Sequence, residues 1–331
     1  MARTLRIATF NVENLDDRPD REPSLAARLR VLQPRLRRLA ADLLCLQEVN
    51  AQPSYRHGPR RLDALDALLR GTPYETHARV ATTDAAGKGP LDVHNLVILS
   101  RLPVLASRQL HHDLVPPPSY RPVTADPPAE AASALTWDRP LLHAEIDLGG
   151  RRPLHLVNLH LRAPRAAFIP GQKAAAGAWK SVPGWAEGFF LAAVKRAGQA
   201  LEARLLVDRL FDADPRALIA VCGDFNAGSR EMPTRLLRAD TRDIGDERLA
   251  TRALAPVEDM VAEARRYSVL HRGHKEMLDH LLVSPALLPW CRRVVIDNEG
   301  LGDETTPAAE LGPESFHAPI VAEFVLPEDD D

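Results

Sequence analysis

The stretch Leu218-Ile-Ala-Val-Cys-Gly-Asp-Phe-Asn-Ala227 is an apolar run that ends in two polar side chains. Residues 218–222 have the length and composition of a buried strand. Asp224 and Asn226 follow it at once. Taken alone, these two residues have an ordinary explanation as an Asx-turn. The loops at the ends of rigid strands are also where proteins build ligand and catalytic sites, so the segment is a candidate for function.

Five further segments place polar side chains beside or at the ends of apolar runs in the same way. In chain order they are Thr9–Leu15, Leu46–Val49, Val157–Leu161, Leu278–His280 and Ser315–Pro319. Each of them alone can be a turn, a cap or a strand end. Together the six segments supply Asn, Glu, His, Asp-x-Asn, Asp and His in one order, which core packing does not require.

These segments resemble the successive signatures of the endonuclease/exonuclease/phosphatase superfamily. The matching letters are TFNVENL (9–15), CLQEV (45–49), VNLHL (157–161), GDFNA (223–227), MLDHLLVS (277–284) and SFHAPIVAEF (315–324). The resemblance spans residues 5–325. It implies a DNase I-like fold of class α/β: a four-layer α/β-sandwich in which two packed mixed β-sheets are flanked by helices, with the site at one edge of the sheets.

The hydrophobic pattern agrees with this fold. Strand-like runs fall in hairpin pairs, as on either side of Gly149-Gly150, and not in regular βαβ units. Helical spacing is concentrated in 25–39, 62–70 and 190–205. We therefore expect one domain over residues 1–327 with long loops at 111–140 and 162–185, followed by an acidic tail at 328–331.

The resemblance implies a metal site made by three residues. Glu48 matches the metal-binding glutamate, Asn11 the asparagine that helps to hold the metal, and Glu13 an acidic second contact found in some members. Carboxylate and amide oxygens are hard ligands, which Mg²⁺ or Mn²⁺ prefers. Such an ion would offset the charge of a phosphate ester and assist the leaving alkoxide.

The resemblance also implies five catalytic residues. His160 matches a histidine that contacts the scissile phosphate, and Asp224 and Asn226 match the pair at the attacking water. His317 matches the histidine that stabilises the pentacovalent phosphorane, and Asp279 matches the aspartate that orients it. His280 follows Asp279 on a strand, so its side chain should point to the opposite face and into the core.

The chain departs from the superfamily pattern at Phe316, where an aspartate is usual. A phenyl ring cannot bind a hard cation. Three consequences stay open at this stage. The metal rests on Glu48 and Glu13 with more water, or a loop carboxylate such as Asp303 or Glu304 substitutes, or catalysis is lost and phosphate-ligand binding remains.

The function implied is that of a metal-dependent phosphodiesterase or nuclease, endo- or exonucleolytic, that hydrolyses by in-line attack of water. A phosphomonoesterase (phosphatase), or a hydrolase of lipid or inositol phosphates, is the alternative. The segment 162–190 mixes basic and aromatic side chains, which suits nucleic-acid bases and phosphates, a lipid interface, or a lid packed by its own aromatics. Arg139 and Arg162 are expected to bind substrate.

Composition limits the setting. The net charge is −3, which argues against a surface coated with positive charge for sequence-blind nucleic-acid binding. The three cysteines stand far apart without a CxxC motif, and Cys45 and Cys222 lie in apolar runs, so we expect core thiols in a reducing, cytoplasmic compartment. No run of about 18 apolar residues occurs, and stable membrane insertion is not expected. The sequence leaves the oligomeric state open.

Overall fold

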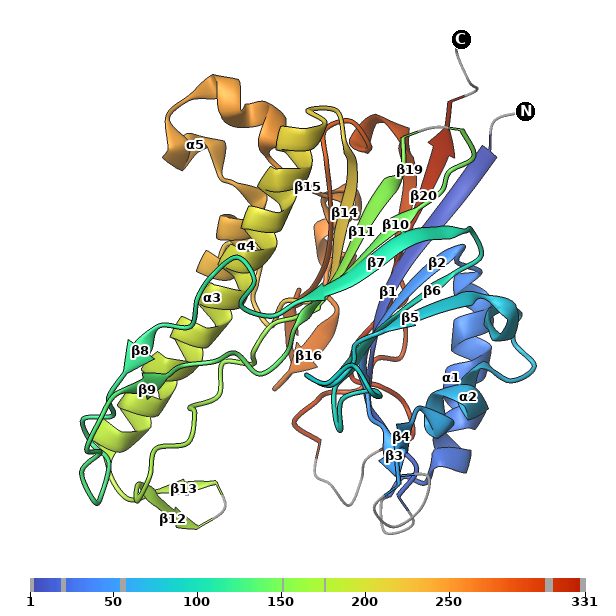
Figure 1. Cartoon of the computed structure of the whole chain (residues 1–331). Helices are drawn as coiled ribbons and strands as arrows, with labels where there is room; N and C mark the ends of the chain where they lie inside the picture. Colours follow the sequence, from blue (N-terminus) through green and yellow to red (C-terminus); the bar gives the residue numbers. More distant parts are fainter. Residues whose placement is uncertain are drawn as a thin grey trace.

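The computed structural model describes residues 3–18, 22–53, 58–150, 152–175, 177–306 and 312–327. The predicted acidic tail at 328–331 lies outside these residues. Two six-stranded sheets form the centre of the molecule, with helices against their outer faces (Figure 1). The four-layer α/β-sandwich predicted from the sequence is therefore confirmed.

The first sheet has the order β19-β20-β1-β2-β6-β5. Its strands are β19 (Cys291–Ile296), β20 (Ile320–Leu326), β1 (Arg3–Leu15), β2 (Leu43–Val49), β6 (Asn95–Ser100) and β5 (Ala78–Ala81). β1 runs parallel to β2 and antiparallel to β20, so the sheet is mixed. Helices α1 (Leu25–Leu39) and α2 (Asp63–Leu69) cover its outer face.

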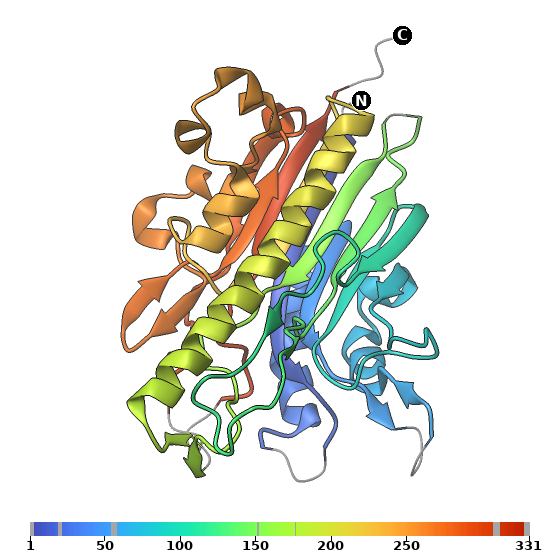
Figure 2. The same ribbon diagram turned by 60° about the vertical axis from the view of Figure 1, so that its left-hand side comes forward.

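The second sheet has the order β15-β18-β14-β11-β10-β7. Its strands are β15 (Ala255–Pro256), β18 (Asp279–Val283), β14 (Leu218–Asp224), β11 (Leu154–His160), β10 (Leu141–Ile146) and β7 (Val104–Leu110). β11 and β14 are parallel, and β18 is antiparallel to β14. The long helix α3 (Val182–Ala213) lies across this sheet (Figure 2), followed by α4 (Met232–Arg238) and α5 (Thr241–Ile244).

The loops contain several short elements. They are the hairpins β3 (Gln52–Pro53) with β4 (Arg60–Arg61), β8 (Ser119–Tyr120) with β9 (Ser133–Ala134), β12 (Lys173–Ala175) with β13 (Ala178–Trp179), and β16 (Val269–His271) with β17 (His274–Glu276). Single 3-10 turns are η1 (Pro73–Thr76), η2 (Glu247–Arg252), η3 (Val257–Met260), η4 (Glu263–Arg265) and η5 (Leu288–Trp290).

Alternation along the strands divides the core. Ile7 and Cys45 of one sheet pack against Leu156 and Cys222 of the other, which places the inter-sheet core between them. The three cysteines are buried and free, as expected for Cys45 and Cys222. No helix among the described residues is long and apolar enough to cross a membrane.

The structure differs from the sequence prediction where α3 begins. The predicted loop 162–185 gives way to a helix that starts at Val182, because Ser181 caps it by accepting the N–H of Gly184 at 3.1 Å. Gly184 and Gly188 weaken a helix on propensity, but close packing requires a glycine at Gly188. A Cβ at Gly188 would lie 2.4 Å from the carbonyl oxygen of Ala167.

The predicted loop 111–140 holds only the short hairpin β8–β9, yet α3 fixes it at both of its ends. Glu202 of α3 is fully buried and accepts hydrogen bonds from the backbone N–H groups of His112 and Leu114 and from the indole of Trp137. Nearer the N-terminus of α3, Glu187 accepts a hydrogen bond from the hydroxyl of Tyr120. The loop is thus anchored by two carboxylates of one helix.

Candidate active site

A cavity of about 290 Å³ opens where the carboxyl ends of β1, β2, β11 and β14 meet. Seven of the ten residues predicted for the site line it, with His94, Asn14, Ala163, Arg165, Glu304 and Phe316. Two more, Asn11 and Asp279, lie directly behind lining residues to which they are hydrogen-bonded. Segments from all along the chain therefore converge on one polar pocket between the ends of the two sheets.

Asn11 links the predicted metal carboxylate to the predicted water-binding aspartate. Its Nδ2 donates to Oε1 of Glu48 at 3.2 Å and to Oδ2 of Asp224 at 3.0 Å. Its Oδ1 accepts the backbone N–H of Glu13 at 2.9 Å, which fixes the orientation of the amide. Asn11 therefore turns N–H groups and not its oxygen toward the carboxylates. It thereby holds the carboxylates of Glu48 and Asp224 in place.

Glu48 is positioned by both oxygens. Oε2 accepts the backbone N–H of Asn14 at 3.0 Å, while Oε1 faces Asn11 and lies 3.6 Å from Nε2 of His160. Burial favours the neutral form, but the surrounding histidines, first His160 and then His94, bring the pKa of Glu48 below its usual value. The carboxylate is charged at neutral pH and available to a cation.

Asp224 and Asn226 occupy the turn after β14. The backbone N–H of Asn226 donates to Oδ1 of Asp224 at 2.8 Å, and its side-chain amide donates to Oδ2 at 3.0 Å. Gly223 makes this turn possible, because a Cβ there would lie 1.9 Å from the carbonyl oxygen of Leu159 on β11. Burial opposes the charge of Asp224, but His317 and His160 hold its pKa well below its usual range.

His160 completes the inner wall of the pocket. Its Nε2 lies 3.3 Å from Oδ2 of Asp224, and its side chain is buried. Nδ1 of His160 and Oδ1 of Asp279 are buried without a hydrogen-bond partner among the described residues. The centre of the site thus keeps polar capacity that the protein itself does not satisfy.

His317 and Asp279 bridge the two sheets. Nδ1 of His317 pairs with Oδ2 of Asp279 at 2.8 Å. Ser315 sets the loop before β20, since its Oγ donates to the carbonyl of Asn11 at 2.7 Å and accepts the N–H of His317 at 3.1 Å. Burial disfavours the imidazolium, yet Asp279 and Asp224 raise the pKa of His317 well above its usual value.

Phe316 makes a backbone contact with the second predicted metal carboxylate. Its N–H donates to Oε2 of Glu13 at 2.8 Å, and its ring packs against Gly302. Burial raises the pKa of Glu13, and repulsion from the charge of Glu48 adds a smaller effect in the same direction. A shared cation would relieve this repulsion. Both carboxylates line the cavity and are of the ligand type that Mg²⁺ or Mn²⁺ prefers.

The two loop carboxylates differ in availability. Glu304 lines the cavity and pairs with Nδ1 of His271. Asp303 points to the β16–β17 turn, where it accepts the N–H groups of Arg272 and Gly273. Of these two carboxylates, Glu304 lines the cavity and Asp303 does not.

Arg139 lies in the pocket as predicted, and it reveals a partner that the sequence analysis missed. Its guanidinium donates to Nδ1 of His94 at 2.7 Å and to the carbonyl of Leu161 at 3.3 Å. Because Nδ1 accepts, Nε2 of His94 carries the proton, and it donates to Oδ1 of Asn14 at 3.0 Å. Burial and the Arg139 charge lower the pKa of His94 to about 4, so this imidazole is neutral.

Arg162 does not line the cavity. Asp138 holds its guanidinium, and Lys195 pairs with the same carboxylate at 3.0 Å. The exposed Arg165, three residues further on, takes the place at the cavity rim. The segment after β11 therefore reaches the site as expected, through a different arginine.

Backbone strain is concentrated at this pocket. Of nine described non-glycine residues with positive φ, five belong to the site. They are Glu13, Asn14, Glu48, His94 and Asn226, with φ between 47° and 61°. Such conformations cost about 1 kcal/mol or more each and persist where surrounding contacts impose them, as they do at functional sites.

The chain belongs to the endonuclease/exonuclease/phosphatase family, whose model matches residues 8–307. Members of this family are generally metal-dependent phosphoesterases. Comparison with curated protein sequences gives no match.

Solved structures share the fold along the whole chain. An endonuclease/exonuclease/phosphatase family protein from Bacteroides thetaiotaomicron is 14% identical, with a TM-score of 0.58 over 100% of this chain and 98% of that one. Truncated TDP2 from Caenorhabditis elegans is 15% identical, with a TM-score of 0.56 over 97% of each chain. TDP2 from D. rerio, solved with a single-strand DNA product, is 16% identical, with a TM-score of 0.53 over 97% and 98%. These likenesses establish the DNase I-like fold.

Proposed function

We propose that this protein is a divalent-metal-dependent phosphodiesterase that hydrolyses a phosphate ester of a nucleic acid by in-line attack of water. One observation carries the proposal. Asp224, His317 and Glu48 face one cavity, and each is held in the charged form that phosphoester hydrolysis needs. The base Asp224, the cation His317 and the metal-type carboxylate Glu48 thus face the same cavity, each with its own task.

Each group has a chemical task. Asp224, unprotonated and fixed by Asn226, accepts a proton from the attacking water. His317, protonated and oriented by Asp279, stabilises the charge that builds on the phosphoryl oxygens. A Mg²⁺ or Mn²⁺ ion held by Glu48 and Glu13 would offset the charge of the phosphate and of the leaving oxygen. Arg139 supplies a further positive charge on the opposite wall.

The basic-aromatic segment 162–190 supports a nucleic acid as substrate. The N-terminal part of α3 extends past the strand ends near the site, with β8–β9 and β12–β13 beside it (Figure 1). Trp185 and Phe189 are exposed and stack on each other with ring centroids 5.8 Å apart, and Phe168 is 68% exposed. Exposed rings of this kind can stack on unpaired bases. The single-strand DNA product bound to D. rerio TDP2 is consistent with such a substrate.

Part of the same segment packs on itself. Ile169 and Leu191 form a small core with Ala125, and Trp179 lies under the ammonium of Lys173 at 3.6 Å. This packing gives the segment a defined shape and leaves Phe168, Trp185 and Phe189 exposed. Trp185 stacks on Phe189, and Phe190 contacts Tyr120, so aromatics of the segment also pack on one another.

A substrate panel tests the proposal. Single-stranded DNA, double-stranded DNA, RNA, a phosphomonoester, an inositol phosphate and a phospholipid are each incubated with the protein and Mn²⁺ or Mg²⁺, with Asp224→Asn as the inactive control. We expect cleavage of single-stranded nucleic acid that Asp224→Asn loses. Turnover confined to the phosphomonoester or to the lipid would replace the proposed substrate class, and turnover retained in Asp224→Asn would refute the site.

A further inference from the structure

A second cluster of metal-type ligands lies on the outer face of the second sheet. His143 and Glu145 are two residues apart on β10, so their side chains share a face, and His155 of β11 is the direct cross-strand partner of Glu145. The neighbouring residues on each strand, Ala144 on β10 and Leu156 on β11, point into the inter-sheet core. The cluster is thus a feature of sheet register and not of a mobile loop.

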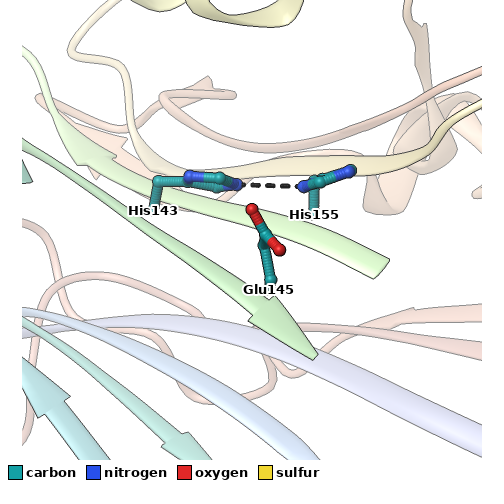
Figure 3. Close-up of side chains that lie close together, drawn as sticks. All are labelled: His143, Glu145 and His155. Atoms are coloured by element: carbon teal, nitrogen blue, oxygen red, sulfur yellow. Dashed lines mark hydrogen bonds between the residues drawn. The ribbon is translucent and has the colours of Figure 1, made fainter. Parts of the chain in front are cut away.

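The ligand atoms converge. Nε2 of His143 lies 3.2 Å from Nδ1 of His155, and one ligand atom from each of the three residues lies within 4.8 Å of the others. Figure 3 shows the two imidazoles side by side with the carboxylate of Glu145 turned toward the gap between them. Their planes are inclined by 28°, and their ring centroids lie 5.3 Å apart.

These distances match the ligand edges of a tetrahedral metal site. Zinc binds imidazole nitrogen at about 2.0–2.1 Å, which puts two tetrahedral nitrogen ligands about 3.3–3.4 Å apart. A site with two histidines and one glutamate leaves one position for water or another ligand. Imidazole with carboxylate suits Zn²⁺ and the later divalent transition metals, whereas Mg²⁺ prefers all-oxygen sites.

We propose that His143, Glu145 and His155 form a binding site for a zinc-type divalent ion, separate from the phosphate site. His155 precedes His160 by five residues on β11, which is about 16 Å along an extended strand and on the opposite face of the sheet. His143 is buried, whereas Glu145 and His155 are half-buried and leave access from solvent. The ion would tie β10 to β11 near the open edge of the second sheet.

The surroundings keep the ligands competent. Burial, followed by His155 and Arg108, lowers the pKa of His143 to about 3, and burial lowers that of His155, so both rings are neutral at neutral pH. Arg108 stands opposite His143 on β7. Its charge opposes a cation, and the carboxylate of Glu145 offsets it. Without an ion, the His143–His155 contact is a hydrogen bond between two neutral imidazoles. The number of zinc ions bound per chain distinguishes this hydrogen bond from a metal site.

Zinc binding to the full-length chain tests the proposal. The protein is stripped with EDTA and dialysed against micromolar Zn²⁺ with excess Mg²⁺, and bound zinc is measured by mass spectrometry for wild type, Glu145→Gln, His155→Gln and Glu48→Gln. Changing groups that merely orient a zinc ligand costs about 10–100-fold in affinity, so removing a direct ligand should cost at least about 100-fold. Glu145→Gln preserves side-chain shape, and circular dichroism verifies that each variant is folded.

We expect one zinc per chain in wild type and in Glu48→Gln, and its loss in both Glu145→Gln and His155→Gln. Mg²⁺-dependent hydrolysis should persist in Glu145→Gln and His155→Gln. The result for zinc is therefore independent of the proposed function. Absence of zinc from wild type, or equal zinc in Glu145→Gln and His155→Gln, would overturn the site. Loss of zinc in Glu48→Gln alone would assign the ion to the phosphate pocket instead.

Discussion

The carboxylate of Asp279, on β18 of the second sheet, accepts a hydrogen bond of 2.8 Å from Nδ1 of His317, which precedes β20 of the first sheet. The contact ties the two sheets together at the substrate end of the molecule. It fixes the ring so that Nε2 is left to act in the pocket, and it stabilises the imidazolium against burial.

The pH dependence of hydrolysis follows from this pair. The pKa of His317 is raised, so the imidazolium is present through neutral pH and is lost only as the pH rises through that raised value. We expect the rate to fall on the alkaline side. Asp279→Asn removes the largest favourable charge and should move this fall to lower pH, whereas His271→Asn, which changes the partner of Glu304 and not of His317, should leave it in place. A pH–rate profile of kcat measures both, and an unshifted profile in Asp279→Asn would contradict the assignment.

Phe316 gives a test of the metal site. Phe316→Asp adds a carboxylate beside Glu13 and Glu48, and we expect tighter binding of Mn²⁺, measured by electron paramagnetic resonance titration. Phe316→Asn is the matched control, because it adds a polar side chain of the same shape without charge. Equal affinity in the aspartate and asparagine variants would show that the carboxylates do not share one ion.

The two predicted substrate arginines should behave differently. Arg139 lies in the pocket and Arg162 is paired with Asp138, so Arg139→Gln should raise KM for an anionic phosphodiester more than Arg162→Gln does. A hydrogen bond to a charged group contributes about 1.5–3 kcal/mol, which corresponds to about 10–150-fold. Steady-state kinetics on the same substrate compares the two variants. A larger effect of Arg162→Gln would mean that substrate displaces Asp138.

The buried pair His280–Glu258 should contribute to stability. Nδ1 of His280 lies 2.6 Å from Oε1 of Glu258, and both side chains are buried. Removing one partner of a buried ion pair costs about 3–5 kcal/mol, so Glu258→Gln should lower the free energy of unfolding by that order. Urea unfolding measures it, with Glu263→Gln on the surface as the control.

The stabilisation that the His280–Glu258 pair contributes depends on pH. Burial lowers the pKa of His280, but Glu258 more than compensates and raises it above the unfolded value of about 6.5. Its stabilisation is therefore fully present below about pH 6.5 and is lost as the pH rises through the folded value. Unfolding of wild type and Glu258→Gln at several pH values should converge on the alkaline side, and a constant difference would contradict this account.

The strands and most of the pocket residues could be predicted from the sequence, because each leaves a pattern within a short stretch of chain. Alternation along a strand places Asp279 in the site and His280 in the core, and the structure confirms the buried position of His280. Apolar runs gave the strands, and polar residues at their ends gave most of the pocket. Glu48 and Asp224 lie far apart in the chain, yet both follow buried strands, so the common edge of the sheets brings them together.

The missed features depend on packing between distant segments. His94 follows no polar signature, and its role arises from Arg139 on one side and Asn14 on the other. The start of α3 was obscured because Gly184 and Gly188 disfavour a helix locally, whereas the nearby carbonyl of Ala167 requires the small size of Gly188. Such contacts have no trace in periodicity or composition.

His317 and its partners are proposed to hydrolyse a phosphodiester with a divalent metal. The most direct measurement is hydrolysis of bis-p-nitrophenyl phosphate and of single-stranded DNA with Mg²⁺, Mn²⁺ or EDTA, by wild type and His317→Ala. Removal of one group that stabilises developing charge costs about 100–1000-fold in kcat. We predict cleavage that needs the metal and falls by that order in His317→Ala while the fold is retained. Cleavage that survives EDTA, or that His317→Ala performs as well as wild type, would contradict the account.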